Sequence, residues 1–205
     1  MFNYWRNQYT ARGFVPGGMF TNKDICYIPI PKNSSSYVGK LMLANHWGVN
    51  NYLTTDLSNK KVIVLLRDPV ERWISGMAQY LCSTGYPADL TIEKWNSLTT
   101  TLVFDRLIFD DHTEKQVYFI NIVPEENCVY FNGTHGVAEK LQKYLTGQGI
   151  DLNINIDITP SDDSQNKKLV KFLRELISQD DRFVLRIKDV YAEDYRLIHR
   201  VKFYD

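Results

Sequence analysis

Apolar residues gather in two short runs, and a polar loop and a helical pattern follow each run. Residues 24–30 are mostly apolar, and residues 61–66 are almost purely aliphatic. Such runs are typical of strands buried in a parallel sheet. Behind them, apolar positions recur every three or four residues over 35–45 and over 69–81, which predicts amphipathic helices. The pattern therefore places a strand, a loop and a helix in succession twice.

The rest of the chain continues this alternation and closes with helices. We predict strands over 116–122 and 127–131, an edge strand or extended segment over 151–158, a polar loop over 159–166, and helices over 86–109, 137–145, 165–178 and 180–201. This order predicts an α/β fold with a central parallel sheet flanked by helices. No change of composition marks a boundary, so we expect residues 1–205 to form a single domain.

Composition limits the classes of partner. The 24 basic and 24 acidic residues balance, so a broad electrostatic surface for nucleic acid is not expected, and an anion site must come from local placement of charge. No apolar run approaches the about 18 residues of a membrane span, and no signal-peptide core is visible, so we expect a cytoplasmic protein with no membrane partner. The three isolated cysteines fit reduced thiols, and no Cys/His spacing suggests a metal site.

The first loop is Pro31-Lys32-Asn33-Ser34-Ser35-Ser36. It combines a lysine, successive N–H groups and three hydroxyls at the start of a helix, where the helix dipole also favours an anion. The loop lacks the glycines of the Walker pattern, which disfavours an ordinary nucleoside triphosphatase. The alternative is a plain N-terminal cap, since serines often cap helices.

The second loop follows the aliphatic strand. Arg67 lies where α/β proteins usually place ligands, and Ser75 comes on the second turn of the next helix. Asp68 is predicted to cap that helix, with Pro69 as its first residue. The alternative is that Arg67 pairs with a nearby carboxylate and that Ser75 is a surface residue.

Together, in this order and spacing, the two loops resemble the sulfotransferases that use 3′-phosphoadenosine 5′-phosphosulfate (PAPS). That family has Pro-Lys and a Ser/Thr-rich run before one helix, then Arg-Asp-Pro and a serine on the next. The sequence of residues 67–75, RDPVERWIS, is most similar to that of the carbohydrate-modifying and bacterial branches. The likeness covers residues 24–81 and continues more loosely through 110–116 and 190–195. It implies a P-loop-NTPase-like sulfotransferase fold.

The resemblance also implies roles for individual residues. The first loop would hold the 5′-phosphosulfate through Lys32, Asn33, Ser34, Ser35 and Ser36, and Arg67 and Ser75 would hold the 3′-phosphate. Lys32 would also stabilise the leaving oxygen, and no metal would be required. One departure is that many soluble members have glycine where this chain has Ser34. The chain also lacks the Gly-x-x-Gly-x-x-Lys segment of the small-molecule branch, which disfavours a phenol or steroid acceptor, and the likeness to the carbohydrate branch favours a saccharide.

The acceptor hydroxyl or amine needs a base. His112 is the first candidate, because Asp110 and Asp111 would raise its pKa and orient its ring, and the family likeness at His112 and Gln116 favours an acceptor-side role. The alternatives are His46 or a carboxylate. His46 lies at the far end of a helix about 15 Å long.

Two other functions stay open at this point. One is a nucleotide-dependent kinase with an atypical phosphate loop, which would need Mg²⁺. The other is a catalytically inactive nucleotide-binding protein. The sequence does not identify the acceptor or the oligomeric state.

Overall fold

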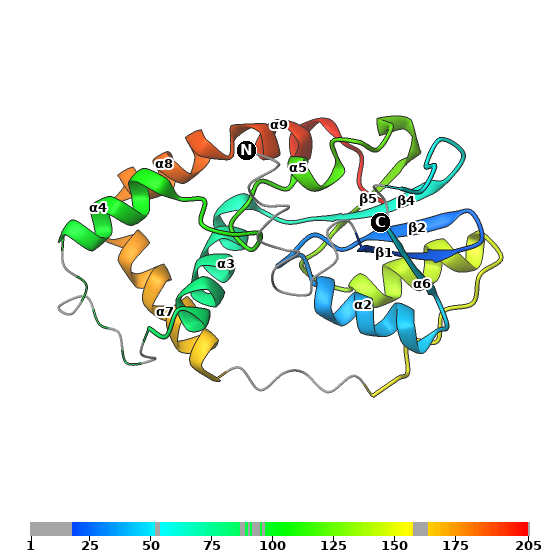
Figure 1. The fold of residues 1–205 in the computed structure, drawn as a ribbon, viewed down its shortest axis with the longest axis horizontal. Coiled ribbons are helices and arrows are strands. Elements are labelled where there is room, and N and C mark those ends of the chain that lie inside the picture. The colour runs from blue at the N-terminus through cyan, green and yellow to red at the C-terminus, as the bar shows by residue number, and fades with distance from the viewer. Residues whose placement is uncertain are drawn as a thin grey trace. The chain divides into compact units, whose positions relative to one another are not determined.

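The computed structural model describes residues 18–51, 54–86, 89, 91, 95, 97–157 and 164–204 (Figure 1). Within them the chain is of the α/β class, with five strands in one sheet. The strands are β1 (Gly18–Asn22), β2 (Ile25–Ile28), β3 (Gly48–Asn51), β4 (Lys61–Leu66) and β5 (Cys128–Asn132), in the spatial order β3-β1-β2-β4-β5. The α/β class predicted from the sequence is confirmed.

The sheet is mixed, not parallel throughout as the sequence predicted. Strands β2, β4 and β5 are parallel, whereas β1 is antiparallel to both β2 and β3. The cause is a tight hairpin: Asn22 pairs with Ile25, so only two residues connect β1 to β2. Lys23, in this connection, has a φ of 52°. Two-residue hairpin turns require such positive φ angles, and they join antiparallel strands.

The described residues divide into two compact units. The first lies within residues 1–67, 116–160 and 200–205, and the second within residues 68–115 and 161–199. The first unit contains the sheet with α2 (Ser35–Ala44), α5 (Val117–Ile120), the 3₁₀ turn η1 (Glu125–Asn127) and α6 (Val137–Gly147). The second contains α3 (Pro69–Ser83), α4 (Ser97–Arg106), α7 (Ser164–Ser178), α8 (Asp181–Val190) and nearly all of α9 (Ala192–Arg200).

The core of the first unit lies on one face of the sheet, under α2 and α6 (Figure 1). Large side chains from three neighbouring parallel strands meet residues of both helices there; they include Tyr27, Ile63, Leu65, Phe131, Val38, Leu41, Met42, Leu141 and Leu145. Each fully buried aliphatic side chain of this kind contributes about 1.5–3 kcal/mol to stability. This packing fixes the ends of β2 and β4, from which the two candidate loops extend.

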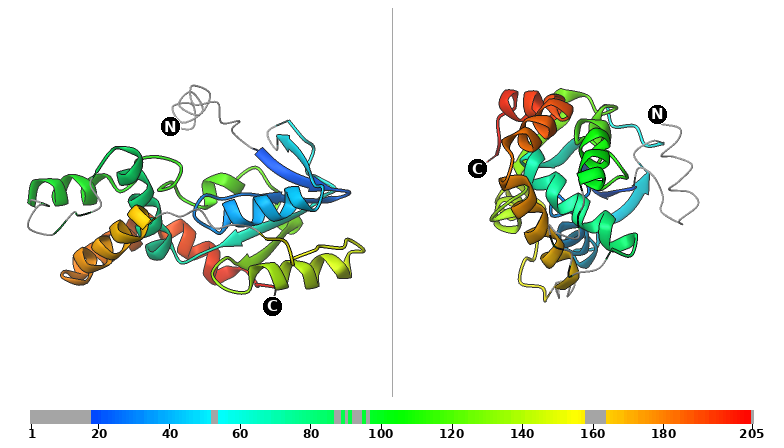
Figure 2. Two further views of the ribbon diagram at one scale, coloured as in Figure 1. Left: turned by 90° about the horizontal axis from the view of Figure 1, so that it is seen from below. Right: turned by 90° about the vertical axis from the view of Figure 1, so that its left-hand side faces the viewer.

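The second unit is held together by helix packing. Figure 2 shows α3 beside α7, and the two helices share a core with α8. Trp73 of α3 is fully buried, contacts the ring of Phe104 at 5.4 Å and donates its indole N–H to the Leu107 carbonyl at 2.9 Å. The buried aromatic ring thus has both an apolar neighbour and a hydrogen-bond partner for its polar edge.

Several predicted elements are confirmed and others are wrong. The strand over 61–66 has the predicted bounds, and the helices over 35–45, 137–145 and 165–178 are present as α2, α6 and α7. The predicted strand over 116–122 is instead the short helix α5. Residues 151–157 form no strand, so the extended-segment alternative applies, and residues 158–163 lie outside the described part of the chain.

The last two predicted helices also differ from the structure. Part of the 86–109 segment lies outside the described residues, and helix α4 occupies only 97–106 of the rest. The helix predicted over 180–201 is broken at Tyr191 into α8 and α9. Tyr191 is 1% exposed and its hydroxyl donates to the Thr113 carbonyl. A side chain anchored in this way fixes the position at which the helix is interrupted.

The edge of the sheet at β5 is partly covered by the C-terminal segment. Tyr130 forms a bridge with Phe203, and the Tyr204 amide donates to the Tyr130 carbonyl at 2.8 Å. The three cysteines are free thiols. Among the helices of the described residues, none combines the length and the apolar character needed to cross a membrane.

Candidate functional site

The two candidate loops begin at the carboxyl ends of neighbouring strands. Strand β2 pairs in parallel with β4, with Ile28 opposite Val64. Parallel neighbours end at the same edge of a sheet, which is where open α/β sheets bind ligands. The structure therefore brings the Lys32–Ser36 loop and Arg67 together, as the sequence predicted.

The first loop uses left-handed backbone at two residues that carry side chains. Lys32 has a φ of 66° and Ser34 a φ of 60°. Helix α2 starts at the next residue, Ser35, and Ser36 follows it on the exposed side of the first turn. Successive N–H groups in a loop of alternating handedness form an anion-binding concavity. Two left-handed residues on either side of Asn33 thus lead the loop into α2 although it contains no glycine.

The Ser34 side chain does not cap helix α2. Its hydroxyl donates instead to the Gly133 carbonyl at 2.9 Å, and it forms no bond with the first turn of the helix. The first N–H groups of a helix have no partners within the helix itself. The interpretation of this loop as a plain serine cap is therefore wrong for Ser34, and the N-terminus of α2 keeps donors that can meet an anion.

Asn33 is a structural residue of the loop. Its side chain is 0% exposed, and its amide nitrogen donates to the Leu65 carbonyl at 2.7 Å and to the Gln116 side-chain oxygen at 2.6 Å. A buried amide that binds strand backbone in this way is held in place by the sheet. The side chain of Asn33 therefore anchors the loop, and its backbone N–H also bonds within the protein, to the Ile30 carbonyl at 3.2 Å.

Arg67 is held at both its backbone and its side chain. Its N–H donates to the Gln116 side-chain oxygen at 3.0 Å, and its carbonyl accepts from the Gln116 side-chain nitrogen at 2.9 Å. Its guanidinium donates to the Lys32 carbonyl at 3.3 Å. This contact places the arginine beside the first loop. A guanidinium presents five N–H donors in a planar fork.

The carboxyl end of a third strand, β5, lies at the same edge of the sheet as the two loops. Gly133 follows β5, and its N–H donates to the Leu66 carbonyl at 2.8 Å. A β-carbon on Gly133 would lie 3.3 Å from the Leu66 oxygen and 3.6 Å from the Asn33 oxygen. Gln116 and Gly133 thus support both loops, and the sequence interpretation had placed Gln116 on the acceptor side. The local sequence around Gln116 and Gly133 does not indicate this supporting role, because both residues bind groups that are distant in the sequence.

The second helix start differs from the first. The Asp68 side chain accepts from the Glu71 N–H at 3.0 Å and Pro69 is the first helical residue, as predicted. A capped N-terminus has fewer donors to offer an anion. Ser75 lies on α3, in the second compact unit, and is half-buried.

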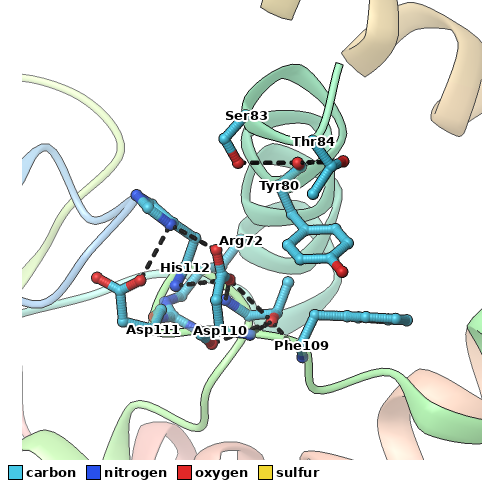
Figure 3. A network of polar contacts seen from close by, with 9 residues as sticks. Arg72, Tyr80, Ser83, Thr84, Phe109, Asp110, Asp111 and His112 are labelled. Carbon is cyan, nitrogen blue, oxygen red and sulfur yellow. Dashed lines mark hydrogen bonds and ion pairs between the residues drawn. The ribbon is translucent and has the colours of Figure 1, made fainter. Parts of the chain in front are cut away.

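His112 lies in a network of the second unit (Figure 3). Its Nδ1 is 3.0 Å from an Asp110 carboxylate oxygen and 3.1 Å from an Asp111 oxygen. Figure 3 shows the other end of the imidazole ring pointing away from both carboxylates. The two carboxylates therefore fix the ring and make Nδ1 the donor, which leaves Nε2 on the outer side.

The two carboxylates also change the charge of His112. Burial alone would lower its pKa, but the hydrogen bonds and charges of Asp110 and Asp111 outweigh burial and raise the pKa of His112 to about 9. The ring is consequently an imidazolium at neutral pH. In that state it can donate a proton or stabilise negative charge, but it cannot accept a proton as a base.

The loop that carries His112 is clamped against α3. Arg72 is 1% exposed, and its guanidinium donates to the backbone carbonyls of Glu114 and Asp111, the latter at 3.3 Å. A β-carbon on Gly76, one turn later, would overlap with the His112 carbonyl oxygen. The loop therefore contacts the helix at backbone distance, and its position is set by α3.

Asp110, Asp111 and His112 also have side-chain atoms that all lie within 4.8 Å of one another, a spacing at which they could hold a metal ion. Their mutual hydrogen bonds already account for this spacing, because the carboxylates surround a protonated Nδ1. His46 lies after the last residue of α2, at the opposite end from Lys32, and it is exposed. Its distance along a ten-residue helix, about 15 Å, keeps it away from the first loop.

No protein-family model, no curated protein and no solved structure matches this chain.

Proposed function

We propose that the protein is a sulfotransferase that moves a sulfuryl group from PAPS to a hydroxyl or amine, with a saccharide as the acceptor. The observation that carries this proposal is the start of helix α2. Its capping serine is turned away to Gly133, and an arginine from the next strand reaches the same loop. An uncapped helix start beside an arginine suits a ligand with two separated phosphates.

The first loop would bind the 5′ end of the donor. Ser35 and Ser36 supply hydroxyls and N–H groups, and Lys32 supplies a positive charge. In the reaction, the bond from sulfur to the bridging oxygen breaks while the acceptor oxygen or nitrogen bonds to sulfur, and the acceptor's proton passes to a base, either His112 in its neutral form or a carboxylate. Lys32 would neutralise the charge that collects on the bridging oxygen, an effect of about 3 kcal/mol for one well-placed donor. Ser34 remains a departure from the family, in which many soluble members have glycine at this position; its left-handed backbone is the conformation that glycine favours.

Arg67 would bind the 3′-phosphate, which distinguishes PAPS from ATP. Ser75 and His112 keep the roles that the sequence resemblance implies for them, as predictions. The raised pKa of His112 restricts its role: as a base it would act only where the ring is neutral, above about pH 9. At neutral pH, where the ring is charged, a carboxylate is the alternative base.

Calorimetric titration without Mg²⁺ tests the donor class. We expect micromolar binding of 3′-phosphoadenosine 5′-phosphate, about −8 kcal/mol, and weaker binding of AMP and ATP. The Arg67→Ala variant should lose about 10- to 100-fold in affinity for the bisphosphate and little for AMP. Arg174→Ala, an exposed arginine paired with Glu71, is the matched control and should bind like wild type.

Each other result identifies a competing function. Preference for ATP, or binding only with Mg²⁺, would support the kinase. Tight bisphosphate binding with no transfer of sulfuryl groups to saccharides would support an inactive binding protein. If no nucleotide binds, both loops are structural and the proposal is wrong.

A further inference from the structure

Gln116 pairs with Arg67 as a neighbouring strand would. Its side-chain oxygen accepts the Arg67 N–H at 3.0 Å, and its side-chain nitrogen donates to the Arg67 carbonyl at 2.9 Å. These are the two bonds that one residue of an adjacent antiparallel strand would make. Gln116 is 0% exposed, so leaving either partner unsatisfied would cost about 1–3 kcal/mol. The amide therefore holds Arg67 in one orientation.

The same side chain holds the first loop. The oxygen of Gln116 also accepts from the Asn33 side chain at 2.6 Å, and that nitrogen donates in turn to the Leu65 carbonyl at 2.7 Å. One buried oxygen is thus shared by the two loops. Neither loop can move without breaking a hydrogen bond of the other.

The side chain of Arg67 makes a second link between the two loops. Its guanidinium donates to the Lys32 carbonyl at 3.3 Å, next to Asn33 in the chain. The contacts form a ring that runs from Lys32 to Asn33, to Gln116, to Arg67 and back. All four residues lie in the first compact unit.

We propose that Asn33 and Gln116 are positioning residues that link the two loops so that they become ordered together, and that the two phosphates of the nucleotide therefore bind cooperatively. This inference rests on the proposed function. A phosphate at one loop fixes that loop, and through the shared hydrogen bonds it fixes the other. The second phosphate then binds to a loop that is already ordered, which is a positive coupling between the two ends of one ligand.

The coupling can be measured with four ligands: 3′-phosphoadenosine 5′-phosphate, AMP, adenosine 3′-monophosphate and adenosine. Without coupling, the two phosphates would improve affinity by independent factors. Each factor is the gain in affinity over adenosine, measured with AMP for one phosphate and with adenosine 3′-monophosphate for the other. For wild type we expect the gain of the bisphosphate over adenosine to exceed the product of these two factors at least 10-fold. For Gln116→Met, which keeps the volume and removes the amide, the excess should fall to within about 2-fold of unity.

Two further variants separate positioning from general loss of structure. Gln142→Met is the matched control, because Gln142 also donates to a backbone carbonyl, that of Leu152 at 2.9 Å, away from both loops. It should retain the full excess. Gln116→Glu should lack the excess at pH 8, where the carboxylate has no proton to donate to Arg67, and regain it as the pH falls toward 5 and the acid becomes a donor.

Retention of the excess by Gln116→Met, or the absence of an excess in wild type, would overturn the inference. Amide hydrogen exchange without ligand gives a separate measurement: Gln116→Met should accelerate exchange at the Arg67 amide at least 10-fold, and an unchanged rate would also overturn the rigid pairing. If wild type binds none of the nucleotides, the proposed function fails and cooperative binding fails with it. The exchange result then still shows whether the two loops are joined.

Discussion

Lys32 and Ser34 adopt a backbone conformation that is unfavourable for residues with side chains. A left-handed conformation costs an L-residue about 1–2 kcal/mol, and both φ angles lie in that region. The loop keeps this conformation because Asn33, between them, is buried and bound to the sheet. The energetic cost of the left-handed backbone is therefore confined to this loop, and Asn33 holds the loop in that conformation.

Two substitutions at Ser34 separate these contributions. Ser34→Ala loses the bond to Gly133 and keeps the left-handed backbone, so it should lower the free energy of unfolding by about 1 kcal/mol. Ser34→Gly loses the same bond and relieves the backbone, so it should lie within about 0.5 kcal/mol of wild type. Urea unfolding of the three proteins measures the difference. Equal losses for alanine and glycine would show that the backbone at Ser34 is not strained.

At the scale of elements, α2 and α3 begin in different ways although both follow a strand. Asp68 caps α3, whereas Ser34 leaves α2 uncapped. The sequence predicts the first fact and not the second. An aspartate before a proline commonly caps the N-terminus of a helix. A serine can bond to its own helix or, as here, to a glycine 99 residues away.

Elements with a strong local signal are predicted well, and those fixed by distant contacts are not. The aliphatic run of β4 can only be buried, so its bounds follow from the sequence. Residues 116–122 have the β-branched and aromatic side chains of a strand, but residues 117–120 form the short helix α5. It is the Gln116 side chain that bonds to the Arg67 backbone, where a neighbouring strand would otherwise pair. Asn33 and Arg67 were predicted as ligand residues. The hydrogen bonds from Gln116 that support both residues arise only from the tertiary fold.

Gly76 provides a test of how α3 holds the His112 loop. A methyl group there would overlap with backbone, not with a flexible side chain, so the loop or the helix must move. Gly76→Ala should therefore destabilise the protein by about 3 kcal/mol, at the upper end of the cost of overpacking.

Gly147→Ala is the matched control. Gly147 is also helical, and a β-carbon there would meet no atom within 4 Å. This change should be neutral or stabilising by up to about 1 kcal/mol, because alanine has the higher helix propensity. Thermal or urea unfolding of both variants checks the pair. Similar stabilities for the two would contradict the close contact between Gly76 and the loop.

At the scale of the whole molecule, the net charge is zero. We therefore expect the pH dependence of stability to come from individual groups such as His112. Its pKa rises from 6.5 when unfolded to about 9 when folded, so its contribution to stability is fully present below pH 6.5 and is lost as the pH rises through 9. The loss should be about 1–2 kcal/mol, less than full linkage, because 34% of the side chain is exposed.

Urea unfolding at pH 6, 7.5 and 9.5 measures this dependence. Wild type should lose stability over this range relative to His112→Gln, which has no titrating ring. His46→Gln, a change at an exposed histidine, should follow wild type. Parallel curves for wild type and His112→Gln would mean that Asp110 and Asp111 do not hold the ring in its charged form.

The C-terminal segment on β5 makes the two edges of the sheet unequal toward other molecules. Tyr130 already has Phe203 and Tyr204 beside it, so a strand from another protein could add along β5 only by displacing them. At the opposite edge, β3 has no further strand beside it within the described residues, and it is short and exposed, with two asparagines. Strand addition, which drives both peptide recognition and aggregation, is thus confined to the edge with the fewest backbone groups to offer.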